Sequence, residues 1–480
     1  MINRRNFIKN TIGSAAYIGL AGFNFIPKKL SNDLKPNIIF ILTDDLGSTD
    51  LSCYGQKLFS TPNIDTIAQN GMKFTQFYSG SSLCAPSRCT LLTGKHQGHA
   101  TVRHNQKFGE DLKEGELTIA SMLKTAGYST ACIGKWGVGH NPAPDSPNKH
   151  GFDYHFGYVN MWHAHNYYPE FLYRNGEKVY LKNKVKNVPK DKYFPDLVGW
   201  AYEKHEYSHD LFIDEAVKYI DKTKDPFFMY LALTIPHENG EADLFNPDDT
   251  FEVPDLGPYA DKPWTRDEKG KAAMIDRMDK GIGAIIKKLK EKKLFENTII
   301  AFTSDNGGNE FPTLISNYPL RGYKNQFYEG GIRVPFLIQW PKKIKSGTTS
   351  DHIAAFYDVM PTLGILASAS KIPENDGISF ASALMGKTQK QHEYLYWEMA
   401  KDDGFQQVVR YGEWKAICNS DYKKMNDNAY TPEMELYNLK NDISETKNVV
   451  AEHLDLVEKI KSIIKKEHSY HPGFKPLTQN

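Results

Sequence analysis

The sequence has 480 residues, of which 40% are hydrophobic and 24% are charged. This composition excludes a disordered chain and predicts a packed protein of about two to four folding units. Lys and Arg total 59 and Asp and Glu total 58, so the net charge of +1 argues against a nucleic-acid-binding protein with a broad basic surface. Five cysteines are too few for a disulfide scaffold.

The N-terminus has the pattern of an export signal. Arg4 and Arg5 form a twin-arginine pair, and a short apolar stretch follows it up to Ala21. We therefore predict a twin-arginine signal over residues 1–30 and a periplasmic or secreted bacterial protein. An ordinary Sec signal is the alternative, and it also predicts export. The stretch is too short to span a bilayer and no long apolar run follows, so we expect no transmembrane anchor.

After the signal, apolar strands alternate with helical segments. Residues 38–42 form a continuous apolar run, which is typical of a strand buried on both faces. The pattern then predicts helices and strands in alternation: helix 63–70, strand 72–78, helix 117–126, strand 129–133, helix 210–223, strand 227–234, helix 272–294, and strands 298–303 and 334–340. Such alternation predicts an α/β sandwich around a large, mostly parallel sheet in a catalytic domain over residues 35–370.

The pattern changes after about residue 370. Short strands are expected at 394–397, 407–418 and 434–439, and a helix at 449–465. This predicts a smaller C-terminal α+β subdomain over residues 371–480.

Reactive side chains follow five of the predicted strands, at or near the point where each strand ends. In open α/β sheets, ligands bind beyond the carboxyl ends of the strands. We therefore expect these side chains to meet: Asp44, Asp45, Cys84, Lys135, His237, Asp305 and Asn306.

Three carboxylates and an amide in this set suggest a metal site. Asp44, Asp45 and Asp305 would repel one another unless a cation lay between them. Ligation by oxygen alone favours Ca²⁺, with Mg²⁺ second. Asp-Asp and Asp-Asn-Gly-Gly are also ordinary turn sequences, but their coincidence at matching strand ends favours a metal held by these carboxylates and Asn306.

The segment Cys84-Ala85-Pro86-Ser87-Arg88 opens a predicted helix that ends at Gly94. Cys84 then lies at a helix N-terminus, where the backbone N–H groups and the helix dipole favour an anion. Arg88 lies one turn further and can reach back. The alternative is a small buried cysteine beside a helix cap.

The full string resembles the signature of the type I, formylglycine-dependent sulfatases, Cys/Ser-x-Pro-x-Arg followed by Thr-Gly. Other segments resemble further motifs of this family, in the same order along the chain: residues 37–45, 134–136, 234–237, 303–308, 320–324, 328–335, 435–439 and 445–448. The resemblance spans nearly the whole mature chain, and it implies an alkaline-phosphatase-like fold.

The resemblance also implies a mechanism. A maturase would oxidise Cys84 to formylglycine, and the hydrated aldehyde, polarised by the metal, would attack the sulfate sulfur. The second hydroxyl would then lose its proton, and sulfate would depart. Arg88, Lys135 and Lys324 would surround the sulfate, and His237 would protonate the leaving alkoxide.

One position departs from the family pattern. Many members have His directly after Gly-Lys-Trp, but this chain has Gly137. We hypothesise that His165 supplies the imidazole or binds substrate, with His140 as the next choice. Gly137 and the downstream Ala-His-x-Tyr-Tyr-Pro resemble a branch of carbohydrate sulfatases active on sulfated galactans. This favours a galactose-type sulfate at a chain end, in polysaccharide degradation.

Other histidines and other activities complete the predictions. His96, His99 and His104 have no convincing metal-ligand spacing and are expected at the surface; the alternative is that their loop borders the active-site pocket. The main alternative function is a phosphonate or phosphodiester hydrolase of the same superfamily. A second alternative is that the chain is a non-catalytic glycan-binding protein in which Cys84 stays unmodified.

Overall fold

The computed structural model describes residues 35–105, 111–139, 142–188, 198–224, 226–400, 404–421, 423–424 and 431–471. The chain divides into two units, Met1–Leu34 and Lys35–Asn480. The predicted export signal and His140 lie outside the described residues.

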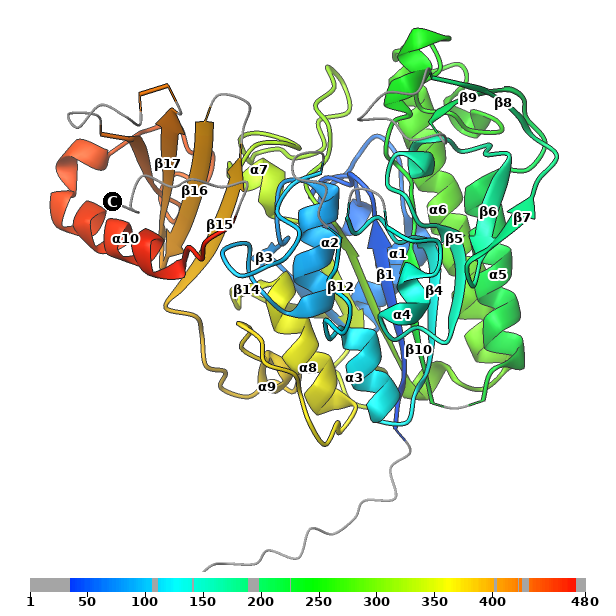
Figure 1. Cartoon of the computed structure of the whole chain (residues 1–480), viewed down its shortest axis with the longest axis horizontal. Helices are drawn as coiled ribbons and strands as arrows, with labels where there is room; N and C mark the ends of the chain where they lie inside the picture. Colours follow the sequence, from blue (N-terminus) through cyan, green and yellow to red (C-terminus); the bar gives the residue numbers. More distant parts are fainter. Residues whose placement is uncertain are drawn as a thin grey trace, which may run out of the picture. The chain divides into compact units, whose positions relative to one another are not determined.

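A sheet of ten strands forms the centre of the second unit, in the order β13-β2-β12-β11-β1-β10-β4-β5-β6-β7 (Figure 1). In chain order the strands are β1 (Asn37–Thr43), β2 (Met72–Phe74), β4 (Ser129–Lys135), β5 (Tyr154–Tyr158), β6 (Phe171–Arg174), β7 (Glu177–Tyr180), β10 (Phe227–Ala232), β11 (Thr298–Ser304), β12 (Phe336–Gln339) and β13 (Thr348–Ser350). The run β11-β1-β10-β4-β5 is parallel, whereas β12, β6 and β7 pair antiparallel with their neighbours. The predicted mixed, mostly parallel sheet is thus confirmed.

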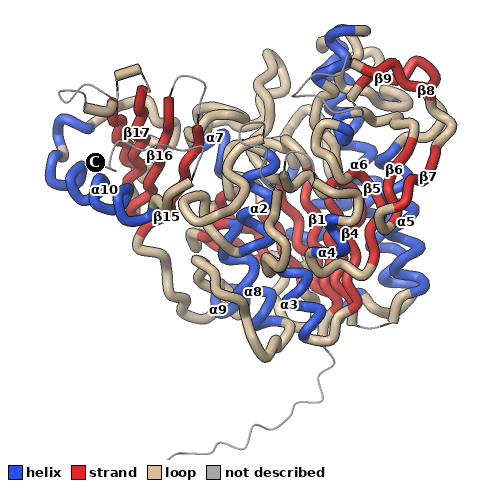
Figure 2. Tube along the Cα trace, viewed as in Figure 1, coloured by secondary structure: helices blue, strands red, loops and turns tan. Residues whose placement is uncertain are grey.

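Helices cover both faces of this sheet (Figure 2). One face packs against α2 (Cys84–Thr93), α3 (Ile119–Thr125) and α8 (Val359–Leu366), and the other against α1 (Pro62–Gln69), α5 (Ser208–Lys222) and α6 (Arg266–Glu291). All seven residues of β1 are buried, with Phe40 on the first face and Ile41 on the second. A strand buried on both faces has no polar alternation, which is why residues 38–42 read as one apolar run. Short helices α4 (Ser146–Lys149), α7 (Glu329–Ile332) and α9 (Ala381–Leu384) lie in the connections.

The C-terminal part forms a separate antiparallel sheet of β15 (Tyr394–Ala400), β16 (Gly404–Tyr411), β17 (Trp414–Asp421) and β18 (Glu433–Asn438). Helix α10 (Leu454–Glu467) packs on one face of it, through Ile460 and Ile464. On the other face, Trp397 packs with Tyr78 and donates its indole N–H to the Ser79 carbonyl at 2.9 Å. The sheet therefore supports the segment that leads into α2.

Several predicted elements differ from the observed ones. Residues 72–78 form two strands, β2 and β3 (Phe77–Tyr78), and β3 pairs with β14 (Ala354–Ala355) in a small sheet of its own. Residues 407–418 form a hairpin, because Gly412 adopts a φ of +57° at the first position of its two-residue turn. Strands β5 to β7 were not predicted, nor was the two-stranded sheet of β8 (Lys184–Asn187) and β9 (Gly199–Glu203). None of the helices that the structure describes is both long and apolar enough to cross a membrane.

Candidate active site

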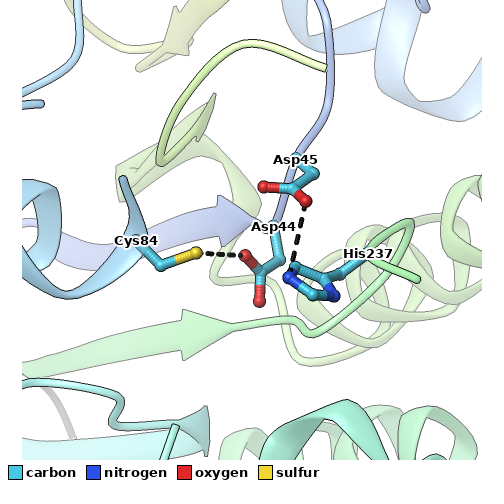
Figure 3. Close-up of side chains that lie close together, drawn as sticks. All are labelled: Asp44, Asp45, Cys84 and His237. Atoms are coloured by element: carbon cyan, nitrogen blue, oxygen red, sulfur yellow. Dashed lines mark hydrogen bonds and ion pairs between the residues drawn. The ribbon is translucent and has the colours of Figure 1, made fainter. Parts of the chain in front are cut away.

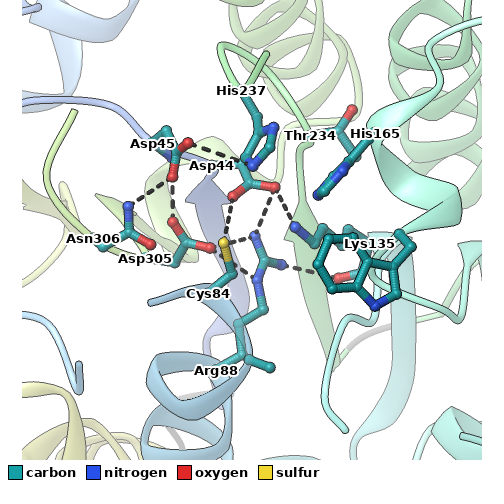
Figure 4. Close-up of polar contacts among 12 residues, drawn as sticks. Asp44, Asp45, Cys84, Arg88, Lys135, His165, Thr234, His237, Asp305 and Asn306 are labelled. Carbon is teal, nitrogen blue, oxygen red and sulfur yellow. Dashed lines mark hydrogen bonds and ion pairs between the residues drawn. The ribbon is translucent and has the colours of Figure 1, made fainter. Parts of the chain in front are cut away.

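Two acidic segments meet at the carboxyl ends of the neighbouring parallel strands β1 and β11. Thr43 pairs with Ser304 at the end of this ladder, so the residues that follow are brought side by side. Asn306 donates its amide N–H to Asp45 Oδ1 at 2.7 Å, and the Asp45 backbone N–H donates to Asp305 Oδ1 at 3.2 Å. Asp44, Asp45, Asp305 and Asn306 are each at most 1% exposed. The four predicted metal ligands therefore form one buried cluster (Figure 4).

Cys84 faces this cluster from the first residue of α2. Its Sγ lies 3.4 Å from Asp44 Oδ1, and its side chain is buried (Figure 3). Burial, and then the negative charge of Asp44, raise the pKa of the thiol well above its usual range, so the sulfur stays protonated. The sequence placed Cys84 after a strand ending at Tyr78. That strand, β3, lies outside the main sheet, and α2 rather than a sheet edge positions the thiol.

Arg88, one turn along α2, is fully buried and points back into the cluster. Its Nε and Nη2 lie 3.0 and 2.8 Å from Asp305 Oδ2, and Nη1 donates to the Lys135 carbonyl at 3.1 Å. Charge-assisted bonds of this kind fix both orientation and position. Arg88 thus joins the helix that carries Cys84 to β11 and β4.

Two lysines neutralise the remaining carboxylates. Lys135, the last residue of β4, places Nζ 2.7 Å from Asp44 Oδ2, and Lys324 places Nζ 2.7 Å from Asp45 Oδ2. With Arg88, three cations face three carboxylates. The charges of Lys135 and Arg88 overcome burial and hold the pKa of Asp44 well below its usual range.

Asp305 behaves differently from Asp44. Burial and the neighbouring charge of Asp44 raise its pKa to about 7, against the opposing charge of Arg88. Carboxylates this close share a titration rather than ionising independently. A bound cation would stabilise the ionised form of Asp305 and so lower this pKa.

His237 lies in the loop after β10 and is 4% exposed. Its Nε2 lies 2.7 Å from Lys324 Nζ, which has only protons to donate, and its Nδ1 contacts the Glu238 carbonyl. The neutral ring therefore carries its proton on Nδ1. Burial, followed by the charge of Lys324, lowers the pKa of His237 to about 3. Tyr167 donates its hydroxyl to the Thr234 and His237 carbonyls, which holds this loop in place.

His165 lies beside His237. The two rings stack with centroids 4.4 Å apart and an interplanar angle of 21°, and His165 Nδ1 lies 3.0 Å from Glu241 Oε2. Sequence reasoning missed Glu241, because it is one of several acidic residues in the long polar connection after His237. Gly137, which occupies the family's usual histidine position, has a φ of +60°, and a Cβ there would lie 2.9 Å from Lys135 Cε.

A divalent cation fits the residues present. Asn306 Oδ1 is buried and has no hydrogen-bond partner among the described residues, and the surrounding carboxylates offer oxygen ligands of the kind that Ca²⁺ and Mg²⁺ prefer. Ligand atoms of Asp44, Asp45, Cys84 and His237 lie within 4.8 Å of one another (Figure 3). The thiol is protonated and His237 accepts from Lys324, so we favour the oxygen set that includes Asn306 over the set with sulfur and nitrogen.

His96 and His99 lie outside this site. His96 was expected at the surface, but it is buried and its Nε2 lies 3.0 Å from Glu467 Oε2 on α10. Its Nδ1 accepts the Gly98 N–H at 3.1 Å, so Nε2 bears the proton and is not free to ligate a metal. His99 is exposed and pairs with Asp376. The His96–Glu467 contact connects α10 to the segment that follows α2, and it gives the buried His96 ring a partner.

Comparison with known proteins identifies the family. The sulfatase family model matches residues 36–369, and the model for the C-terminal region of N-sulphoglucosamine sulphohydrolase matches residues 322–469. The N-acetylgalactosamine-6-O-sulfatase of Bacteroides thetaiotaomicron is 30% identical over 90% of this chain and 93% of its own length. The arylsulfatase of Hemicentrotus pulcherrimus is 30% identical over 80% of this chain and 67% of its own length.

A solved structure agrees with these relatives. The crystal structure of Ps i-CgsB in complex with k-i-k-neocarrahexaose has 26% sequence identity and covers 92% of this chain and 95% of that chain, with a TM-score of 0.73. The matches span both the large sheet and the C-terminal sheet. This chain belongs to the sulfatase family, with its alkaline-phosphatase-like fold, and it is a sulfuric ester hydrolase.

Proposed function

We propose that this enzyme hydrolyses sulfate esters of carbohydrates, with a preference for a galactose-type sulfate at a chain end. The observation that carries the proposal is the position of Cys84, at the tip of α2 and 3.4 Å from an acidic cluster. Two of the similar proteins support a sugar substrate by name, since one is an N-acetylgalactosamine-6-O-sulfatase and the other is in complex with neocarrahexaose.

Asp44, Asp45, Asp305 and Asn306 would hold the cation, Ca²⁺ before Mg²⁺. The bound ion would supply Lewis-acid polarisation of an oxygen and offset the buried negative charge. Maturation of Cys84 to formylglycine by a separate maturase would supply, after hydration, the hydroxyl nucleophile that a thiol does not provide. The protonated, buried thiol of the unmodified chain is a poor nucleophile in any case.

The three cations would bind and orient the sulfate. Arg88 and Lys135 are fixed by their contacts with Asp305 and Asp44, so they are preorganised around the place where Cys84 points. Donors that need no reorganisation are the most effective stabilisers of a developing negative charge. Lys324 is the least buried of the three, with 13% of its side chain exposed, and is free to turn from Asp45 toward a bound anion.

His237 would deliver a proton to the leaving sugar oxygen. Its Nε2 now accepts from Lys324, so the proton must come from that lysine or arrive when Lys324 turns to the sulfate. Proton transfer by a positioned side chain contributes about 10²–10⁴-fold in rate. The stacked His165 would contact the substrate or assist this transfer, and His140 remains the next choice for the imidazole missing at Gly137.

The remaining parts of the chain complete the proposal. Residues 1–30 would act as a twin-arginine export signal, and the enzyme would work in the periplasm or outside a bacterial cell. Residues 35–370 would form the catalytic domain and 371–480 the C-terminal subdomain. The proposed role is the removal of sulfate during polysaccharide degradation.

The first experiment is the mass of the peptide that contains Cys84. Protein co-expressed with a formylglycine-generating maturase should lose one sulfur and two hydrogens at Cys84 and gain one oxygen. Cys84→Ala protein is the control, and protein made without the maturase should be unmodified and inactive. An intact thiol in protein that nevertheless releases sulfate would contradict the proposed nucleophile.

The second experiment compares ester classes. Matured enzyme is assayed with an aryl sulfate, an aryl phosphodiester and a panel of sulfated mono- and oligosaccharides. We expect sulfate release to dominate, with the largest kcat/KM on a terminal galactose-type sulfate. A larger kcat/KM on the phosphodiester would favour the phosphodiester or phosphonate hydrolase of the same superfamily instead.

A further inference from the structure

A pocket of about 540 Å³ borders the candidate active site. Its lining comprises Glu238, Asn309, Glu310, Phe311, Pro312 and Tyr323. Glu238 directly follows His237 in the chain and Tyr323 directly precedes Lys324, and the side chains of His237 and Lys324 lie 2.7 Å apart. The pocket therefore lies beside the two groups proposed to act at the leaving oxygen.

The segment 309–312, which forms one wall of the pocket, is held in place by contacts of the residues on both sides of it and of Phe311. Asn317 bridges both backbone groups of Gly308, with distances of 3.3 and 3.0 Å. The buried Glu268 accepts the N–H groups of Thr313 and Leu314. Phe311 packs edge-on against Phe251, with ring centroids 5.4 Å apart. A wall fixed on both sides of the lining residues is a preformed surface, which reduces the entropy lost on binding.

The chemistry of the lining suits a sugar ring. Tyr323 is 37% exposed, and an aromatic side chain offers an apolar face with a polar tip. Asn309 and the two glutamates offer acceptors for hydroxyl groups. Pockets that combine apolar surface with a few polar groups are the usual small-ligand sites.

The charge of the lining is opposite to that of the proposed sulfate site. Two of its six described residues are Glu, and none is Lys, Arg or His. Arg88, Lys135 and Lys324, by contrast, surround the point to which Cys84 is directed. A second sulfate or a carboxylate in this pocket would face Glu238 and Glu310, and none of the six described lining residues is a cation that could pair with it.

We infer that this pocket binds a neutral sugar ring adjacent to the sugar that carries the reacting sulfate, and that Glu238 and Glu310 exclude a sulfated or carboxylated sugar there. This inference rests on the proposed function. Specificity of this kind comes from a built-in repulsion as much as from attraction. The enzyme would then act on chains in which the neighbouring sugar is neutral or has already lost its own sulfate.

The test uses three substrates with the matured, full-length enzyme. They are 4-nitrophenyl sulfate, a disaccharide with one sulfate on its terminal galactose, and the same disaccharide with a second sulfate on the neighbouring sugar. We expect kcat/KM to favour the singly sulfated disaccharide by about tenfold, because two surface charges each contribute a few-fold. Glu310→Gln should reduce this preference about threefold. Tyr323→Ala should lower kcat/KM for the singly sulfated disaccharide about fivefold more than it lowers kcat/KM for 4-nitrophenyl sulfate, which has no second sugar.

Matched controls are Glu433→Gln and Tyr202→Ala, which change exposed residues on β18 and β9 and should alter neither ratio. Equal rates on the two disaccharides, or a preference that neither Glu310→Gln nor Tyr323→Ala changes, would overturn the inference. If the matured enzyme turned over none of the three substrates, the proposed function would fail by itself. In that case, calorimetry with the desulfated disaccharide would test whether the pocket binds a neutral sugar. Binding that Tyr323→Ala abolishes would support the inference, and the absence of binding would overturn it.

Discussion

At the scale of single residues, Asn306 gives the sharpest test of the metal proposal. Its Oδ1 is buried without a partner among the described residues, while its amide N–H already binds Asp45. Asn306→Asp would keep the oxygen but replace the donor with a fourth neighbouring carboxylate, after Asp44, Asp45 and Asp305, and Asn306→Ala would remove both. We expect Asn306→Ala to weaken Ca²⁺ binding about 10–100-fold, measured by calorimetry on purified protein.

Removal of the metal gives a second readout of the same site. Treatment with a chelator should lower Tm as well as activity, because a ligand that binds only the folded state stabilises it. Added Ca²⁺ should restore both in the wild-type protein, and restoration should require more Ca²⁺ in Asn306→Ala. A Tm that does not respond to chelator or Ca²⁺ would argue against a cation in this cluster.

His165 and Glu241 form the second residue-scale prediction. Glu241 accepts from His165 Nδ1 and so directs Nε2 away from itself, and burial of the pair makes a lost partner costly. We expect His165→Ala to lower kcat/KM on a sulfated sugar about 10²-fold, and Glu241→Gln to lower it less, with a changed pH profile. A His165→Ala enzyme with full turnover would remove His165 from the proposal, and His140 would be tested next.

The sequence predicted most of the site residues because their motifs are local in the chain. Asp44, Cys84 and Lys135 each lie in a short distinctive string, and the structure brings these strings together. The His165–Glu241 pair was only half predicted. It depends on a contact between residues 76 positions apart in two polar connections, and no periodicity or spacing in the sequence marks such a contact.

At the scale of elements, the buried ion cluster between β17 and α7 is a structural prediction. Lys415 Nζ lies 3.1 Å from Glu329 Oε1 and 2.9 Å from Glu445 Oε1, and all three side chains are fully buried. Lys415→Met would leave two uncompensated carboxylates, so we expect a loss of about 3–5 kcal/mol in the free energy of unfolding. Denaturant titration measures this loss.

The matched control is Lys440→Met, which breaks an exposed pair with Glu413 and should cost less than about 1 kcal/mol. Adding Glu445→Gln to Lys415→Met should recover part of the loss, since one unpaired charge is removed. Equal effects of Lys415→Met and Lys440→Met would mean that the buried cluster does not tie the C-terminal sheet to α7.

Central strands and long helices were predictable, and edge elements were not. β1, β10 and β11 are buried on both faces and read as apolar runs, and α6 shows one apolar face along its length. β7 and β8 are largely exposed, so their sequences lack both an apolar run and a clean alternation. Their pairing depends on tertiary context rather than on intrinsic strand preference.

At the scale of the whole molecule, the ion cluster predicts how stability depends on pH. Burial, and then the charge of Glu329, raise the pKa of Glu445 from its usual 4.5 to about 7, against Lys415. The folded state then binds a proton more tightly than the unfolded chain does. The contribution of Glu445 to the free energy of unfolding is complete below pH 4.5 and is lost as the pH rises through 7.

The pKa of Glu329 is shifted in the opposite direction from that of Glu445, so its effect on stability has the opposite pH dependence. The charge of Lys415 overcomes burial and lowers its pKa to about 2, so its contribution is present above pH 4.5 and is lost as the pH falls through 2. Glu445→Gln should therefore flatten the decline in Tm between pH 4.5 and 7, relative to wild type, and leave the acid limb in place. An unchanged slope in that window would show that Glu445 does not titrate there.

The order of the strands in the large sheet could not be predicted from the sequence, whereas the fold class could. Alternating strands and helices indicate a layered α/β protein, but the placement of β12 between β11 and β2 follows from contacts over more than two hundred residues. The family resemblance supplied the architecture that local patterns do not encode.

Gly137 restricts how this enzyme can be redesigned. A side chain there would have to adopt a backbone angle that favours glycine, and would press on the aliphatic part of Lys135, which is fully buried and paired with Asp44. A histidine at position 137, as in many family members, would thus push Lys135 away from its position beside Asp44. The residues around Lys135 would therefore have to change before a histidine at position 137 could be accommodated. A single substitution of Gly137 should lower stability or activity.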